Sequence, residues 1–354
     1  MRLVLLGDGE SPHLLKWAQA LAPRVDLWAA SSRGFAAGFD AVLPAARRLA
    51  LNTRPRFEGG NVGVLRSLPR LARWLRELRP DWVHAHYLTS HGTLAWAARA
   101  LGRLQFRIAG SAWGSDILVA PERNAATRWL TRRVLRACSL CTSDSIDMAE
   151  RMRTLGAAEV MRLPFGLQAM PPPGAAKDEH LFYANRGLEP IYAPQRVLQV
   201  FGDIARRWPD AELVVGNDGS LRAALERQAR ELGLNDRVRF TGRLDAVAQS
   251  AWYGQARWYL SLPESDAVSA SVLEAMAHGC IPILSDLPAN RELVRDGDNG
   301  LVLGAGRLPD PAALDALAAR AVAIAAANHA WVAREAMFEP AVERFIARLR
   351  AIAA

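Results

Sequence analysis

Asp266 and Glu274 are the side chains whose type and spacing most directly suggest chemistry, because two carboxylates eight residues apart can bracket one ligand. They lie in the segment 263–279, which follows an apolar run at 258–262 and is predicted to open a helix. A helix N-terminus presents unpaired N–H groups and the positive end of a dipole, so a diphosphate could bind between the carboxylates. With both on one helix face, one would reach sugar hydroxyls and the other ribose hydroxyls. A capping aspartate and an incidental surface glutamate would explain the same spacing.

Predicted strands and helices alternate along the chain and would position these residues. Short apolar runs are separated by amphipathic helical stretches, the pattern of βαβ units in a parallel sheet. The strands expected in the first half are 3–6, 25–30, 82–86, 106–109, 139–143 and 160–163, and those expected in the second half are 181–184, 213–215, 238–241, 258–262, 281–285 and 300–303. Between the halves lies a proline-rich stretch without periodicity, 166–174.

The fold class predicted by this alternation is α/β, with two Rossmann-like doubly wound domains facing a central cleft. We expect an N-terminal domain at 1–166, a linker at 167–179, a C-terminal domain at 180–329 and a helical C-terminal stretch at 330–354. Open sheets of this kind bind ligands at the carboxyl ends of their strands, so two substrates could meet where those ends face each other.

The segment that carries Asp266 and Glu274 resembles the donor signature of the family 4 retaining glycosyltransferases of GT-B fold, which is Glu-x7-Glu followed by Ala-Met-Ala-x-Gly. Further stretches resemble the family in the same order along nearly the whole chain: 214–219, 238–243, 282–293 and 296–301. Asp266 departs from the first glutamate and matches a branch with Asp-x-x-Ser-x-Ser-x-x-Glu. In this fold the last helix usually packs back on the N-terminal domain, which the resemblance implies for 330–354.

Carried over by position, the resemblance assigns the donor side of the site. It implies that Asp266 contacts the transferred sugar, as a catalytic residue, and that Glu274 binds the nucleotide ribose. Backbone amides near Ser269 and Ala270, with the Ser271 hydroxyl, would hold the diphosphate. The matching strand ends add three more donor-binding candidates: Gly216, Gly242 and Arg243.

The family commonly places an arginine and then a lysine on the diphosphate, and this chain keeps only the first. Arg186 fits the arginine, but Tyr192 stands where the lysine would be, and neither lysine of the chain is nearby. A phenol donates one neutral hydrogen bond where an ammonium would supply charge. Arg196, one turn further on, could restore that charge, or it could lie on a solvated helix face.

Small and polar residues also follow the strands of the first half. Gly7 and Gly9 end the first strand, and a lone Gly-x-Gly is equally well explained as a plain tight turn. His84 and His86 alternate along the strand at 82–86 and could suggest a metal site. We expect their side chains to point to opposite faces of the strand, one of them paired with backbone in the core, and we predict no metal.

Two turns of the first half resemble those of a subset of the same family, His-x-His-Tyr at 84–87 and Trp-Gly-Ser-Asp at 113–116. Many relatives carry a histidine near the transferred sugar where Trp113 stands. Its replacement leaves Asp116 as the catalytic candidate of that turn. The resemblance thus places His84, His86 and Trp113 on the acceptor side of the cleft, and we add Gly7 and Gly9 from the first strand end.

The amino-acid composition limits the classes of partner that the protein is expected to bind. The 354 residues carry a formal net charge of +8, nearly all of the positive charge being arginine, which suits nucleic acid, anionic lipid or phosphorylated substrates. No zinc-finger, helix-turn-helix or aromatic RNA-binding signature is found, so we expect no nucleic acid.

Cys138 and Cys141 form a C-x-x-C within an expected buried strand, without a second ligand pair, so we expect neither metal nor redox chemistry. No apolar run of 18 residues or signal peptide is found, and we expect a cytoplasmic protein.

Two basic stretches of the first half, 65–78 and 123–137, could contact a membrane. Each combines apolar residues with arginines, and such a face gains about 1 kcal/mol per arginine near an anionic lipid surface. A helix packed on the core with a solvated charged face would show the same pattern.

The resemblance implies a retaining hexosyltransferase that moves a sugar from a nucleotide-sugar, a UDP- or GDP-sugar, to a hydroxyl of a glycan or lipid-linked acceptor. No cofactor is expected, because a helix dipole and arginine can stabilise a leaving diphosphate. The setting implied is bacterial surface-polysaccharide or lipopolysaccharide assembly. Two alternatives stay open: a catalytically silent paralogue that binds a nucleotide-sugar or a partner, and a GT-B nucleotide-sugar epimerase.

Overall fold

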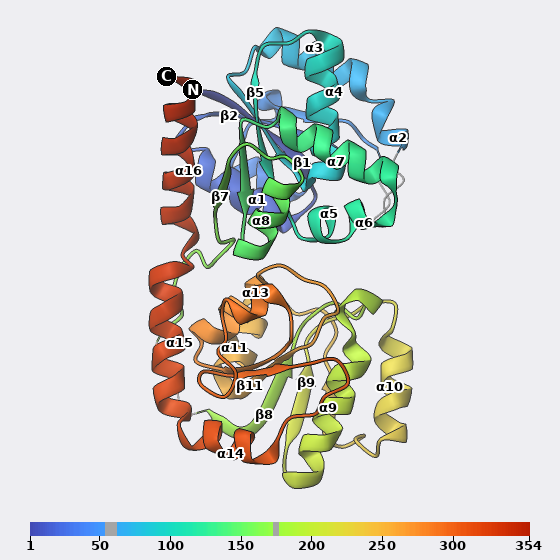
Figure 1. The fold of residues 1–354 in the computed structure, drawn as a ribbon, viewed down its shortest axis with the longest axis vertical. Coiled ribbons are helices and arrows are strands. Elements are labelled where there is room, and N and C mark those ends of the chain that lie inside the picture. Colours follow the sequence, from blue (N-terminus) through green and yellow to red (C-terminus); the bar gives the residue numbers. More distant parts are fainter. Residues whose placement is uncertain (54–61, 173–176) are drawn as a thin grey trace. The chain divides into compact units, whose positions relative to one another are not determined.

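The computed structural model describes residues 1–53, 62–172 and 177–354, and these form two compact units. Unit 1 comprises residues 1–163 and 339–354, and unit 2 comprises residues 164–338. Each unit is a parallel sheet covered by helices (Figure 1). The prediction of two Rossmann-like α/β domains is confirmed.

The described residues of unit 1 form a seven-stranded parallel sheet in the order β3-β2-β1-β4-β5-β6-β7. Its strands are β1 (Arg2–Gly9), β2 (Asp26–Phe35), β3 (Arg48–Ala50), β4 (Trp82–His86), β5 (Arg107–Ser111), β6 (Leu140–Ser143) and β7 (Val160–Arg162). Its helices are α1 (Pro12–Leu21), α2 (Val62–Leu65), α3 (Leu68–Leu78), α4 (Thr93–Gly102), α5 (Ser115–Leu118), α6 (Ala120–Arg123), α7 (Ala125–Ala137), α8 (Ile146–Thr154) and α16 (Phe338–Ala353). The order reverses between β1 and β4, so a crevice is expected where these two strands end.

The described residues of unit 2 form a six-stranded parallel sheet in the order β10-β9-β8-β11-β12-β13. Its strands are β8 (Asp178–Ala184), β9 (Glu212–Val215), β10 (Val238–Phe240), β11 (Ala256–Ser261), β12 (Ile281–Ser285) and β13 (Leu301–Leu303). Its helices are α9 (Pro194–Arg207), α10 (Arg222–Glu231), α11 (Ala246–Gln255), α12 (Ala270–Ala277), α13 (Pro288–Arg291), α14 (Pro311–Ala319) and α15 (Ala321–Glu335). Here the order reverses between β8 and β11.

Apolar side chains fill both faces of the second sheet. Phe182 and Trp258 belong to the core on one face, and their chain neighbours Tyr183 and Tyr259 belong to the core on the other. This alternation follows from the two-residue period of a strand. It explains why the buried parts of these strands, such as residues 181–184 and 258–260, are apolar runs, as is usual for parallel sheets buried on both faces.

The predicted C-terminal helix at 330–354 is interrupted. Residues up to Glu335 complete α15 in unit 2, and α16 begins at Phe338. The break follows pairing with the start of unit 2, because the Leu167 N–H donates to the Ala336 carbonyl and Leu167 forms a bridge with Met337. Only the part from Glu339 onward groups with unit 1, so the expectation for 330–338 was wrong.

Two further stretches that the sequence predicts as single helices are also split. The stretch 65–78 is divided between α2 and α3, and 123–137 is broken at Asn124. Asn124 is extended, with φ −168°, and its side chain accepts from the Thr127 N–H as the N-cap of α7. Within the described part of the chain, no single helix has the length and apolar character needed to cross a membrane, although α14 and α15, bent by 76°, meet that test as a pair.

Candidate active site

The candidate donor residues of unit 2 lie where the strand order reverses. Arg186 follows the end of β8, and Asp266 lies in the loop between the neighbouring strand β11 and α12. Because the carboxyl ends of adjacent parallel strands meet at one edge of a sheet, residues 80 apart in the sequence become neighbours.

Arg186 is the centre of this cluster. Its Nη2 donates to Asp266 Oδ2 at 2.6 Å, and its Nη1 donates to the hydroxyls of Ser269 and, at 3.3 Å, Ser271. Its guanidinium lies over the Tyr192 ring, 4.4 Å from the centroid. The structure therefore brings together five of the residues that the sequence assigned to the donor.

The ion pair of this cluster is largely shielded from water. The side chains of Arg186 and Asp266 are 18% and 19% exposed. Burial raises the pKa of Asp266, and the nearby Arg186 only partly opposes it. Burial works to lower the pKa of Arg186, but the Asp266 carboxylate and three nearby tyrosines together outweigh it, and the pKa rises. A guanidinium with two hydroxyls beside it has the donor groups that an anion such as phosphate requires.

The geometry of the two carboxylates differs from the expectation. α12 begins at Ala270 with Ser269 as its N-cap, so Asp266 precedes the helix and does not share a face with Glu274. Neither is Asp266 the capping residue. The Ser269 hydroxyl makes no cap hydrogen bond and contacts Arg186 and Ser271 instead.

Glu274 lies inside α12 and is not an incidental surface residue. Its Oε2 accepts a hydrogen bond of 3.1 Å from the Tyr253 hydroxyl. The same hydroxyl accepts from Asn185 Nδ2 at 2.7 Å, and Asn185 directly precedes Arg186. Sequence reasoning missed Asn185 and Tyr253, which no motif singled out.

The remaining donor candidates lie at the ends of the next two strands. Gly216 follows β9, and a Cβ there would lie 2.4 Å from the Tyr183 hydroxyl, so packing requires glycine. Gly242 follows β10 with φ +74°, a conformation that favours glycine. Arg243 is exposed beside it.

A small pocket opens at the carboxyl ends of β8 to β11. Its lining is mainly apolar, and Arg186 supplies its charged group; the other lining residues are Ala184, Leu188, Tyr192, Pro194, Val197, Leu198, Val215, Leu225, Phe240 and Leu260. It thus extends from Arg186 to Phe240 at the end of β10, within the stretch 238–243 that resembles the family.

Arg196 does not lie on a solvated face. Its Nη2 donates to the carbonyls of Leu303 and Gly304 at the end of β13. Burial lowers the pKa of its guanidinium. Two carbonyl groups therefore already use the charge that the sequence suggested for the diphosphate.

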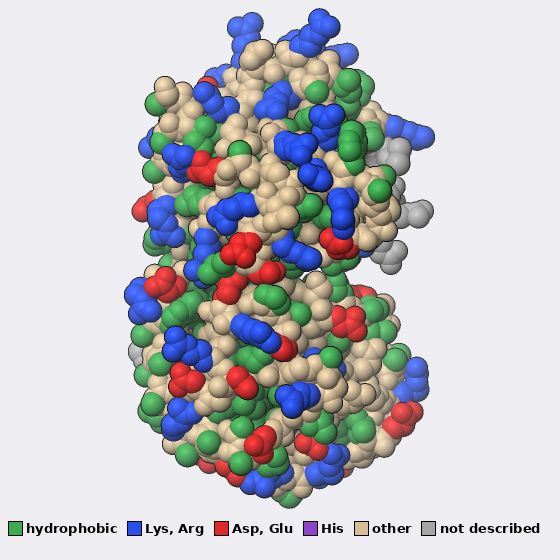
Figure 2. All heavy atoms as spheres, viewed as in Figure 1, with side chains coloured by type: hydrophobic (Ala, Val, Ile, Leu, Met, Phe, Trp, Pro, Cys, Tyr) green, Lys and Arg blue, Asp and Glu red, His purple; other side chains and the backbone are tan. Residues whose placement is uncertain are grey.

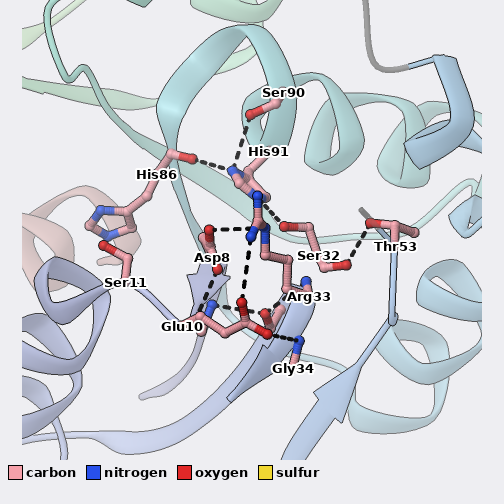
Figure 3. A network of polar contacts seen from close by, with 12 residues as sticks. Asp8, Glu10, Ser11, Ser32, Arg33, Gly34, Thr53, His86, Ser90 and His91 are labelled. Carbon is pink, nitrogen blue, oxygen red and sulfur yellow. Dashed lines mark hydrogen bonds and ion pairs between the residues drawn. The ribbon is translucent and has the colours of Figure 1, made fainter. Parts of the chain in front are cut away.

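In unit 1, the strand ends that carry Gly7 and Gly9 form a polar network (Figure 3). Arg33, at the end of β2, pairs with Asp8 at 3.4 Å and with Glu10 at 3.5 Å. Glycine at position 9 is needed because a Cβ would lie 2.5 Å from the Gly34 carbonyl oxygen. Gly7, Asp8 and Gly9 lie within β1 and form no turn. Close packing explains the glycines, since a Cβ at Gly7 would similarly lie 2.5 Å from the Leu14 side chain.

His84 and His86 lie on the same face of β4, and the expectation of opposite faces was wrong. Side chains alternate along a strand, so residues two apart share a face. Their rings are 4.3 Å apart, and both contact the edge of Trp17. Burial lowers the pKa of His84 to about 3, and its Nε2 bonds to the Ser111 hydroxyl at 2.7 Å. No group of three metal-ligand side chains occurs in the ranges that the structure describes.

Asp116 joins two turns of unit 1. Its carboxylate accepts from the N–H of Trp113 at 2.9 Å and of Leu88 at 2.8 Å, and the side chain is fully buried. Burial raises its pKa to about 6. This geometry makes Asp116 a positioning residue for the turn. Trp113, whose indole N–H donates to His86 Nδ1 at 3.3 Å, stacks on His13.

His91 is a further buried residue that the sequence did not signal. Its Nε2 lies 2.9 Å from the Ser32 hydroxyl, and its Nδ1 lies 2.7 Å from the His86 carbonyl. It therefore ties the turn after β4 to the end of β2 (Figure 3).

The two units differ sharply in charge. Unit 1 has 27 Lys and Arg against 15 Asp and Glu, a formal net charge of +12, whereas unit 2 has 17 against 21, a net charge of −4. Basic side chains crowd the part of Figure 2 that unit 1 occupies. Leu71, Leu75 and Leu78 of α3 are buried in the core, whereas the arginines of α3 and α7 are exposed. Trp129 of α7 is also exposed, at 55%.

Both halves of the chain match known families. A family model described as Glycosyl transferases group 1 matches residues 169–331, and one described as Glycosyl transferase 4-like matches residues 2–145. The GDP-mannose-dependent alpha-mannosyltransferase of Mycolicibacterium smegmatis is 30% identical over 264 residues, which cover 70% of this chain and 67% of that protein. The Alpha-monoglucosyldiacylglycerol synthase of Streptococcus pneumoniae is 30% identical over only 102 residues, which are 29% of this chain and 23% of that protein.

A solved structure shows the same fold over the full length. The crystal structure of Anabaena Alr3699/HepE in complex with UDP-glucose has a TM-score of 0.77 and 14% sequence identity, covering 99% of this chain and 100% of that one. Together with the family matches to both halves and the mannosyltransferase relative, this likeness identifies the fold as GT-B. The chain belongs to the glycosyltransferases of GT-B fold and is a glycosyltransferase.

Proposed function

We propose that the chain is a retaining hexosyltransferase, which transfers a hexose from a UDP- or GDP-sugar to a hydroxyl of a glycan or lipid-linked acceptor. The observation that carries the proposal is the cluster of Arg186, Asp266, Ser269 and Ser271 at the switch point of unit 2. Two similar proteins support the donor class: one is named as GDP-mannose-dependent, and another was crystallised with UDP-glucose.

The diphosphate of the donor would bind at Arg186. The guanidinium can make two parallel hydrogen bonds to phosphate oxygens, and the Ser269 and Ser271 hydroxyls stand beside it. The amides of the first turn of α12 add the positive end of a helix dipole. Asp266 would turn toward hydroxyls of the transferred sugar, and Glu274 would accept hydrogen bonds from the ribose.

During transfer, the bond between the anomeric carbon and the diphosphate oxygen breaks, and the acceptor hydroxyl bonds to that carbon on the same face of the sugar. Negative charge then grows on the leaving diphosphate. Arg186 and the α12 amides would stabilise this charge, and stabilisation that increases as the bond breaks accelerates the reaction. Retention is supported by the likeness of the segment 263–279 to retaining enzymes.

The acceptor would bind to unit 1, at the strand ends that carry Gly9, His86 and Trp113. The acceptor class is supported by a relative whose name specifies diacylglycerol.

We place the enzyme in bacterial surface-polysaccharide or lipopolysaccharide assembly, on the cytoplasmic face of the plasma membrane. The +12 charge of unit 1 would hold it on anionic lipid through the exposed arginines of α7.

Vesicle sedimentation tests the membrane contact. The protein should sediment with anionic vesicles at low salt and be released at 1 M salt, where screening acts over about 3 Å. Replacing Arg128, Arg132 and Arg136 by glutamine should weaken binding, whereas Arg227→Gln with Arg230→Gln on α10 should not. Equal binding to neutral vesicles would contradict the electrostatic account.

A donor screen tests the catalytic proposal. Nucleotide-sugars are ranked by the rise in melting temperature that they cause, since a ligand at 100 times its Kd adds about 2.7 kcal/mol. The best donor is then incubated with lipid and glycan acceptors, and the anomeric configuration of the product is read by NMR. Inversion would refute the retaining mechanism. A changed sugar without any acceptor would indicate an epimerase. Donor binding with neither transfer nor donor hydrolysis would indicate a silent paralogue, the alternative that Asp266, Trp113 and Tyr192 favour.

A further inference from the structure

A chain of buried hydrogen bonds runs through unit 2 from the end of β8 to α12. It begins at Asn185, passes through Tyr253 of α11 and ends on Glu274. Asn185 is 6% exposed and Tyr253 is 1% exposed. The chain therefore links the residue that precedes Arg186 to the second carboxylate of the candidate site.

Each bond in this chain has a defined direction. Asn185 uses both amide hydrogens, one to the Tyr253 hydroxyl at 2.7 Å and one to Gln249 Oε1 at 2.8 Å. Its own Oδ1 accepts from the Tyr259 hydroxyl at 2.7 Å. With its lone pair engaged by Asn185, the Tyr253 hydroxyl directs its hydrogen to Glu274 Oε2 at 3.1 Å.

The consequence for Glu274 is a fixed carboxylate. An ionised carboxylate has about four acceptor positions, and Tyr253 occupies one of them. Tyr253 stays neutral at ordinary pH, because burial raises the pKa of its hydroxyl well above the usual value. Holding one oxygen restrains rotation of the carboxylate.

We propose that Asn185 and Tyr253 are positioning residues that hold the Glu274 carboxylate toward the ribose of the bound nucleotide. This inference rests on the proposed function, which assigns Glu274 to the ribose. It adds that ribose recognition depends on a side chain of α11, outside the donor motif.

The substitution Tyr253→Phe tests it, because phenylalanine keeps the ring and removes the hydroxyl. Affinities are measured by calorimetry for UDP and GDP and for their 2′,3′-dideoxy analogues, which lack the ribose diol. Tyr253→Phe should weaken binding of the tighter ribonucleotide about 3- to 10-fold, as expected for a hydrogen bond to a charged group. Binding of the dideoxy analogue should be unchanged, and KM should rise with kcat maintained.

Tyr183→Phe is the matched control. Its ring packs against Tyr253, at 5.0 Å between centroids, and its hydroxyl forms no hydrogen bond with the described residues. It removes the same atom from the same aromatic cluster, and ribonucleotide affinity should not change. If Tyr253→Phe does not fold, Tyr259→Phe removes the bond that orients Asn185, and the ratio of ribonucleotide to dideoxynucleotide affinity should fall. This ratio is the measurement to use because Tyr259 also interacts with Arg186 and Ser271, which would affect both nucleotides equally.

A double-mutant cycle separates the two proposals. In a Glu274→Gln background, Tyr253→Phe should have no further effect, because both act on the same ribose contact. If Glu274→Gln weakens ribonucleotide binding but the effect of Tyr253→Phe is fully additive, or equal for the dideoxy analogue, the positioning role is refuted and the donor site stands. If Glu274→Gln itself leaves ribonucleotide affinity unchanged, the ribose assignment fails and the positioning role fails with it.

Discussion

The substitution Asp266→Asn should have opposite effects on the stability of unit 2 and on nucleotide affinity. Asp266 uses its two oxygens separately: Oδ1 accepts from the Ala267 N–H at 3.1 Å, and Oδ2 accepts from Arg186. Asparagine keeps the shape of the side chain but has one acceptor oxygen and no charge. One of the two bonds is therefore lost, and Arg186 is left without its counter-charge.

The loss of folding stability in Asp266→Asn can be estimated from the ion pair between Arg186 and Asp266. A hydrogen bond to a charged group contributes about 1.5–3 kcal/mol and a neutral one about 0.5–1.5 kcal/mol. With both side chains less than one-fifth exposed, we expect the free energy of unfolding to fall by about 1–2 kcal/mol. In a unit of this size, each kcal/mol lowers the melting temperature by about 2–4 °C.

The gain in affinity follows from the same charge. A diphosphate bound to Arg186 lies close to the Asp266 carboxylate, and two unit charges roughly 6 Å apart at an effective dielectric constant of about 20 repel by about 3 kcal/mol. Solvent and salt reduce this upper bound, so we expect Asp266→Asn to tighten binding of a nucleoside diphosphate by about 2- to 10-fold. Turnover should fall, because the proposed contact with the sugar is lost.

Calorimetry of UDP and GDP binding, with melting curves of the same samples, measures both effects. Asp286→Asn is the control, because Asp286 pairs with Arg291 at the exposed start of α13 and such pairs contribute little. An Asp266→Asn protein that binds nucleotide ten times more weakly would show that Asp266 mainly orients Arg186. Unchanged affinity together with unchanged melting would remove the ion pair from the argument altogether.

Three further predictions address neighbouring features. Arg186→Ala should weaken nucleotide binding by about 1.5–3 kcal/mol and Tyr192→Phe by about 1 kcal/mol or less, because phenylalanine keeps the ring beneath the guanidinium; calorimetry of each variant measures both. Gly216→Ala should destabilise unit 2 by about 1–3 kcal/mol in urea unfolding, and adding Tyr183→Phe should recover only part of the loss, because it removes the hydroxyl at 2.4 Å from the new Cβ but leaves the ring carbon Cε2 at 2.7 Å. The pKa of His84 is about 3 in the folded state, so as the pH falls below 6.5 His84 is protonated in the unfolded state before it is in the folded state. Lowering the pH from 7 to 5 should therefore reduce the free energy of unfolding by about 2 kcal/mol. The two other buried histidines of unit 1 act in the same direction and a buried carboxyl offsets part of the loss, so calorimetry at pH 7 and 5 should show unit 1 melting lower at pH 5.

Most of the fold could be predicted because the strands of a buried parallel sheet are apolar runs between helices. The strand that the sequence missed is β3, which has three residues at the edge of its sheet and buries only Leu49. The break between α15 and α16 could not be predicted from local sequence, since residues 336 and 337 are Ala and Met. The pairing of this segment with Leu167, which is distant in the chain, interrupts the helix there.

The site was predictable in its residues but not in their contacts. Arg186 and Asp266 could be selected because each follows a strand, but their ion pair depends on the adjacency of β8 and β11. His84 and His86 were assigned to opposite faces although strand geometry places residues two apart on one face, so that error came from reasoning and not from missing information. Tyr253 had no signal at all, because it lies in the interior of a helix and acts through another residue.

The opposite net charges of the two units indicate that unit 2 would bind the donor and unit 1 would bind anionic lipid through different kinds of interaction. Unit 2 is formally negative, at −4, yet it is the unit proposed to bind a diphosphate. A long-range field of that sign would repel the ligand, so recognition has to come from short contacts: one guanidinium, two hydroxyls and the amides of α12. Contacts in a site that excludes water are weakly screened, whereas exposed arginines such as those of α7 act over a Debye length of about 8–10 Å. A glycosyltransferase divided in this way could hold its donor at a salt concentration that releases unit 1 from an anionic surface.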